Sequence, residues 1–143
     1  MKILLLVFIF SALISCGKSP LQMKKTGLET SGNTGLESTK TLKTTQHSLS
    51  LTWLSPVNST DEAHALLIAK KNGSASDLPE QIKIFLWMPT MGHGSSPITV
   101  KKIGTGLYDL SQIYFIMDGF WQLRIQLKNN NETLDEEIFE INI

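Results

Sequence analysis

The chain has 143 residues, of which 41% are hydrophobic and 18% are charged, a composition typical of a globular protein rather than a disordered one. Its 13 Lys and Arg residues balance its 13 Asp and Glu residues, so no basic excess argues for nucleic acid as a partner. The single cysteine excludes an internal disulfide framework, a four-cysteine zinc site and a CxxC redox pair.

The first 15 residues have the pattern of a secretory signal peptide. Lys2 supplies a short positive region, and an apolar run follows from Ile3 to Phe10 before the small residues that precede Cys16. The apolar stretch is too short for a spanning helix, which needs about 20 residues. Residues 1–15 are therefore predicted to be removed on export.

The tetrapeptide Leu13-Ile14-Ser15-Cys16 resembles the lipobox of bacterial lipoproteins. The resemblance implies cleavage before Cys16, a diacylglyceryl group on its thiol and an acyl chain such as palmitate on its amine. Several acyl chains anchor a protein stably to a membrane. Gly17, where inner-membrane lipoproteins carry Asp, implies the outer membrane facing the periplasm. The alternative is a free cysteine just past an ordinary signal peptide.

Residues 16–46 are predicted to be the lipidated cysteine followed by a flexible linker. Positions 17–46 hold 4 Gly, 7 Thr, 3 Ser and 5 Lys, with only 2 Glu and no aromatic residue. Such a segment buries too little apolar surface to offset the entropy cost of ordering it. His47, at the boundary of the linker, is expected to be solvated.

Residues 47–143 are predicted to form one domain of about seven strands. Apolar and polar side chains alternate along several segments, most clearly over 121–128, where four apolar residues alternate with four polar ones. Similar runs occur at 48–53, 63–69, 82–88, 98–100, 113–117 and 139–143, separated by turn signals rich in Gly, Asn and Pro. This spacing is typical of an immunoglobulin-like antiparallel β-sandwich.

The most unusual cluster in the domain joins two methionines and a histidine. Met88, Met91 and His93 lie within six residues, where a predicted strand runs into a glycine-rich loop. Thioether sulfur is a soft ligand that suits Cu(I), and imidazole binds copper as well. Met117 reaches the same end of the sandwich if its strand pairs beside 82–88. The alternative is that the methionines fill the core and the histidine is solvated.

A set of spaced residues resembles the YtkA-like domain family, which is related to the FixH family. The residues are Met88-Pro89-x-Met91-x-His93, Gly106-x-Tyr108 and Phe115-x-Met117-x-Gly119-x-Trp121-x-Leu123. The resemblance covers most of 47–143 and implies a small all-β domain outside the cytoplasmic membrane with a role in copper handling. It implies Met88, Met91, His93 and Met117 as metal ligands, with structural roles for Gly119 and Trp121.

No enzyme is predicted. The sequence has no G-x-S-x-G elbow, Walker loop or H-E-x-x-H motif, and His64 is expected to be exposed rather than a ligand. Two hypotheses remain. One is a lipid-anchored module that binds or traffics Cu(I) and exchanges it with a copper donor or acceptor. The other is an envelope protein–protein interaction module with the same fold and no metal.

Overall fold

A computed structural model describes residues 38–143 of the chain. Ten strands form in this part: β1 (Ser38–Leu42), β2 (His47–Trp53), β3 (Ala63–Lys71), β4 (Ser74–Ala75), β5 (Ile82–Met88), β6 (His93–Gly94), β7 (Thr99–Gly104), β8 (Leu107–Ile113), β9 (Phe120–Asn129) and β10 (Glu132–Asn142). Residues 38–143 contain no helix that could cross a membrane.

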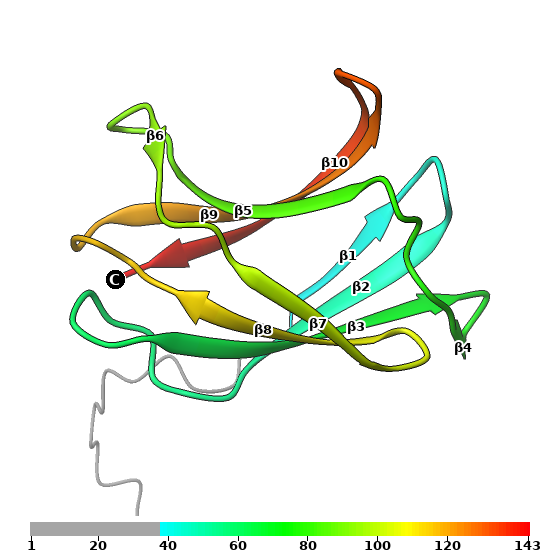
Figure 1. Cartoon of the computed structure of the whole chain (residues 1–143), viewed down its shortest axis with the longest axis horizontal. Coiled ribbons are helices and arrows are strands. Elements are labelled where there is room, and N and C mark those ends of the chain that lie inside the picture. Colours follow the sequence, from blue (N-terminus) through cyan, green and yellow to red (C-terminus); the bar gives the residue numbers. More distant parts are fainter. Residues whose placement is uncertain (1–37) are drawn as a thin grey trace, which may run out of the picture. The chain divides into compact units, whose positions relative to one another are not determined.

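The strands form two antiparallel sheets that face each other as two layers (Figure 1). The six-stranded sheet has the order β1-β2-β3-β8-β7, with β4 pairing on β3, and the four-stranded sheet has the order β10-β9-β5-β6. Every strand pair is antiparallel. The prediction of an all-β antiparallel sandwich is confirmed.

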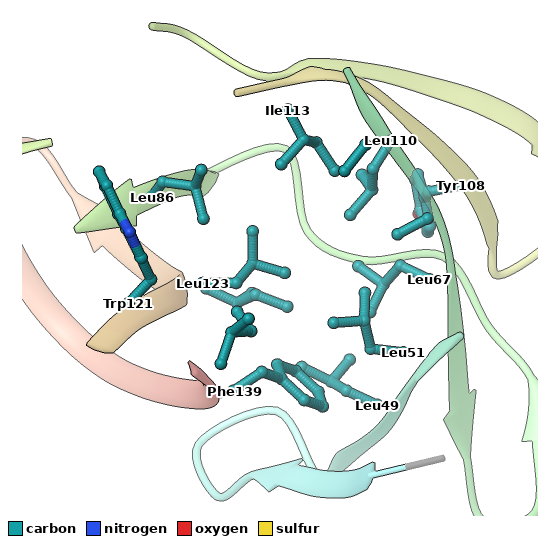
Figure 2. Packing of buried hydrophobic residues seen from close by; sticks show 14 of the residues in the cluster. Leu49, Leu51, Leu67, Leu86, Tyr108, Leu110, Ile113, Trp121, Leu123 and Phe139 are labelled. Atoms are coloured by element: carbon teal, nitrogen blue, oxygen red, sulfur yellow. The ribbon is translucent and has the colours of Figure 1, made fainter. Parts of the chain in front are cut away.

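The core lies between the two sheets, because alternate residues of β2, β3, β8 and β9 are buried on the inward side. Figure 2 shows leucines of the six-stranded sheet, such as Leu49 and Leu67, directed toward Leu123 and Phe139 of the four-stranded sheet. Trp121 is the largest fully buried side chain among residues 38–143, and it lies near the start of β9, beside the end of β5. Burying each such side chain stabilises the fold by about 1.5–3 kcal/mol before entropy costs.

The predicted boundary between linker and domain, at residue 47, is wrong. Ser38–Leu42 form β1, which pairs with β2 along its whole length, and Leu42 is fully buried. A sheet edge tolerates the Ser, Thr and Lys of this segment because half of its side chains face solvent. His47 is not solvated either: it is 4% exposed, and its Nε2 lies 3.3 Å from Ser76 Oγ.

The prediction of a continuous strand from Ile113 to Met117 is also wrong. β8 ends at Ile113, where Gln112 has a φ of 57° and the register with β3 shifts. The Gln112 N–H donates to Glu62 Oε1 at 2.7 Å, which stabilises the irregular backbone. The strand count of about seven falls short of ten mainly because β1, β4 and β6 are short or polar. The predicted signal peptide, Cys16 and linker residues up to 37 lie outside the described residues.

Candidate metal site

The β5–β6 hairpin brings Met88 and His93 into a directly opposite pair. The backbone N–H groups of Met91 and Gly92 both donate to the Met88 carbonyl oxygen, at 3.2 and 3.0 Å, and close the turn. Gly92 has a φ of 69°, which glycine adopts without the cost that other residues incur. Because opposed residues share one face of a sheet with Cβ atoms about 4.5–5.5 Å apart, the thioether and the imidazole start as neighbours.

The imidazole of His93 contacts a backbone carbonyl through one ring nitrogen. Its Nδ1 lies 3.0 Å from the Gly94 carbonyl oxygen. A carbonyl oxygen only accepts hydrogen bonds, so this contact needs a proton on Nδ1, and in the neutral ring Nε2 then holds the lone pair. Histidines that bind metals usually donate their other ring N–H in this manner. The ring also meets Trp121 edge-on, with centroids 6.4 Å apart and planes at 70°.

Met88 belongs to the hydrophobic core as well as to the hairpin. Its side chain is 4% exposed and points inward, on the same side of β5 as Leu86. Its methyl group reaches the loop before β9, where a Cβ placed on Gly119 would lie 2.7 Å from Met88 Cε. The burial of Met88 agrees with the alternative interpretation, in which the methionines fill the core. The end of its side chain also lies against the loop that carries Met117.

Met117 reaches this end of the sandwich by a route that differs from the predicted one. It lies in the loop joining β8 to β9, and the strand that pairs beside β5 is β9, which begins at Phe120. The Met117 carbonyl oxygen accepts a hydrogen bond of 3.0 Å from the Trp121 indole Nε1–H. The Trp121 indole thus connects the Met117 backbone to the His93 ring. The Met117 side chain is 36% exposed.

Met91 lies in the turn of the hairpin and is 56% exposed, the most exposed of the four predicted ligands. The structure therefore pairs Met88 with His93 on one sheet face, brings the loop of Met117 against them, and leaves Met91 at the solvent side. Thioether and neutral imidazole are both ligand types that Cu(I) accepts.

A polar network stabilises the neighbouring loop at the start of β3. Glu62 accepts hydrogen bonds from the Gln112 N–H and, at 3.0 Å, from the Tyr114 hydroxyl. These two bonds, and His64 beside them, hold the pKa of the Glu62 carboxyl below its ordinary value of 4.5. The hydrogen bond between Tyr114 and Glu62 also raises the pKa of the Tyr114 hydroxyl. Sequence reasoning missed this network, because its partners are 50 residues apart and carry no shared pattern.

The other histidines have different partners. His64 Nε2 lies 3.1 Å from Glu62 Oε1, and its side chain is 44% exposed. A group of three or more His, Cys, Asp or Glu side chains that could hold a metal ion is not found within residues 38–143.

Comparisons of the chain with protein-family models, with curated proteins and with solved structures gave no match. The resemblance to the YtkA-like family stays a prediction.

Proposed function

We propose that this chain is a lipid-anchored envelope protein that binds Cu(I) at the end of its β-sandwich and passes the ion to or from a partner protein. The proposed ligands are His93 Nε2 and the Met88 thioether, with Met117 and Met91 completing the set from the loop and the turn. The observation that supports this most is the register that sets His93 opposite Met88 across the β5–β6 hairpin, together with the contact of His93 Nδ1 to the Gly94 carbonyl oxygen.

The chemistry of the site favours Cu(I) over harder ions. Thioether sulfur is neutral and polarisable, so it binds soft monovalent copper without needing a compensating charge. Because Met88 is enclosed by the core, its sulfur lies at the inner wall of the site and is shielded from water. The more exposed Met91 and Met117 suit the entry and release of the ion.

The test is a Cu(I) titration of the full-length protein, in detergent micelles, against a chromophoric Cu(I) chelator. Free thiols are first blocked with N-ethylmaleimide, because an unmodified Cys16 would itself bind Cu(I). One-to-one binding is expected. His93→Ala and Met88→Leu should each weaken it by at least about tenfold. Met88→Leu conserves side-chain volume and should cost less than about 1.5 kcal/mol of stability.

Matched controls separate ligand loss from general damage. Met23→Leu removes a thioether outside the proposed set, and His64→Ala removes an imidazole from another loop. Both should bind Cu(I) as the unchanged protein does. The proposal is wrong if the protein does not compete with the chelator, or if His93→Ala and Met88→Leu retain full affinity.

The second candidate is the metal-free envelope interaction module, and exposed apolar side chains at the same end favour it. Met91 is 56% exposed and Ile116, in the neighbouring loop, is 54% exposed. Methionine-rich surfaces adapt to varied protein partners. If the protein does not bind Cu(I), and if Ile116→Ser abolishes its binding to a partner protein, this second function is the correct one.

A further inference from the structure

The solvent-facing side of the four-stranded sheet carries an ordered set of side chains, here called the outer face. Strand register aligns them in three rows: Trp87–Gln122–Glu140, Phe85–Arg124–Ile138 and Lys83–Gln126–Glu136. Each row crosses β5, β9 and β10 in turn. Because alternate residues of these strands form the core, the outer face is separate from the side of the sheet that carries Met88.

Two aromatic rings form one border of the outer face, and they also line a hollow. Phe85 and Trp87 contribute to a cavity of about 350 Å³ whose other wall is the 94–98 segment. This volume lies within the range of about 300–1,000 Å³ that is usual for small-ligand sites. A cation lies over one face of each ring: Lys83 Nζ is 5.1 Å from the Phe85 centroid, and Arg124 Cζ is 5.8 Å from the Trp87 centroid.

The polar side chains beside the rings are held in place by one another. Arg124 Nε and Nη2 donate to Gln122 Oε1 at 3.0 and 2.6 Å, and Arg124 Nη1 lies 3.6 Å from Glu136 Oε1. Gln126 Nε2 donates to the same Glu136 oxygen at 2.7 Å. This bonding fixes planar donors and acceptors on the sheet, which lowers the entropy cost of binding a ligand there.

The charges on the outer face cancel. Lys83 and Arg124 balance Glu136 and Glu140, so the face lacks the cationic excess that phosphate-rich nucleic acid requires. A neutral ligand that offers both apolar surface and many hydroxyl groups matches this combination.

We propose that the outer face binds a neutral, β-linked glycan chain. A sugar ring has an apolar C–H face, which packs against the rings of Phe85 and Trp87 in the hollow. Its hydroxyl groups alternate as donors and acceptors, and they pair with the amides of Gln122 and Gln126 and the carboxylate of Glu136. An extended glycan then lies across the three strands, with its terminal sugar in the hollow.

The experiment is isothermal titration of the full-length protein with two probes, the β-1,4-linked hexamers of N-acetylglucosamine and of glucose. The micelles consist of a zwitterionic detergent, since alkyl glycoside detergents would compete. At least one hexamer is expected to bind and to change tryptophan emission. Trp87→Ala should weaken binding by about tenfold or more, whereas Trp87→Phe, which keeps an aromatic ring, should retain most of it.

Val100→Ala is the matched control, because it shortens an exposed apolar side chain on β7 of the other sheet. It should bind the hexamer as the unchanged protein does, and all variants should show the same far-UV circular dichroism. The proposal is overturned if neither hexamer binds at millimolar concentration, or if Trp87→Ala binds with unchanged affinity. Self-association of the protein that Trp87→Ala abolishes and glycan does not affect would also overturn it, by assigning the face to a second copy.

Discussion

Gly119 lies in a tightly constrained position at the end of the sandwich, and Gly119→Ala should be strongly destabilising. Its φ is 136°, a conformation that residues with a Cβ rarely adopt. The Gly119 N–H donates to the Ile143 carbonyl, and the Ile143 N–H donates to the Gly119 carbonyl, both at 3.1 Å. These two bonds prevent the backbone from relaxing. A Cβ at this position would also lie 2.7 Å from Met88 Cε.

The magnitude follows from these two effects. A non-glycine residue in such a backbone conformation costs about 1–3 kcal/mol. Displacing the Met88 methyl group adds about 1 kcal/mol, the lower end of overpacking costs, because the end of a methionine side chain is flexible. For a domain of this size, a loss of 2–4 kcal/mol lowers the melting temperature by on the order of 10–20 °C. Thermal unfolding followed by tryptophan fluorescence measures the change.

Gly73→Ala is the matched control, because Gly73 also has a positive φ of 79° but has no atom within 4 Å of an added Cβ. It should cost only the backbone part, about 1–2 kcal/mol. A double-mutant cycle isolates the contact between the added Cβ and Met88. In a Met88→Ala background, the destabilisation caused by Gly119→Ala should be smaller by the part due to the Met88 methyl group. Equal destabilisation by Gly119→Ala in both backgrounds, or a loss no larger than that of Gly73→Ala, would refute the steric argument. The absence of any measurable loss on Gly119→Ala would refute the backbone argument as well.

Two further predictions test the N-terminal strand and the loop network. Leu42→Ala should lower the free energy of unfolding, measured in urea, by about 2–5 kcal/mol, because the Leu42 side chain is fully buried. An unchanged urea midpoint would mean that residues 38–42 belong to the linker. The folded-state pKa of Glu62 is below 4.5, so its stabilising contribution is present above that pH and is lost as the pH falls through the folded-state pKa. Glu62→Gln should therefore flatten the decline in stability below about pH 4.5, and an unchanged acid profile would contradict the assignment.

The fold was largely predictable because the signal is a period of two repeated along many strands. β9 illustrates this: its inward residues from Trp121 to Leu127 are all apolar, so its position in the core follows from alternation alone. β1 was missed because Leu42 is its only large apolar residue, and an edge strand gains its order from pairing with β2. His47 was misjudged for the same reason, since β1 and Ser76 enclose a position that looks like a linker end.

The candidate site was predictable in its residues but not in its geometry. The short spacing of Met88, Met91 and His93 places them in one hairpin whatever the topology. That the loop of Met117 lies against Met88 depends on the β8–β9 connection crossing between sheets, which no local pattern encodes. The tautomer of His93 depends on a backbone carbonyl, and every residue supplies one, so no sequence signal identifies it.

Both proposals involve β5, yet they can be tested independently because successive side chains of a strand point to opposite faces of the sheet. Met88 and Trp87 are consecutive, so Met88 faces the core and His93, whereas Trp87 faces Arg124 on the outer face. Met88→Leu removes a thioether without changing the side chains of the outer face, and Trp87→Ala removes an indole without changing the proposed metal ligands. Loss of Cu(I) binding on Met88→Leu with glycan binding intact, and the reverse result for Trp87→Ala, would separate the two sites. A variant that loses both would instead indicate that the hairpin had lost its structure.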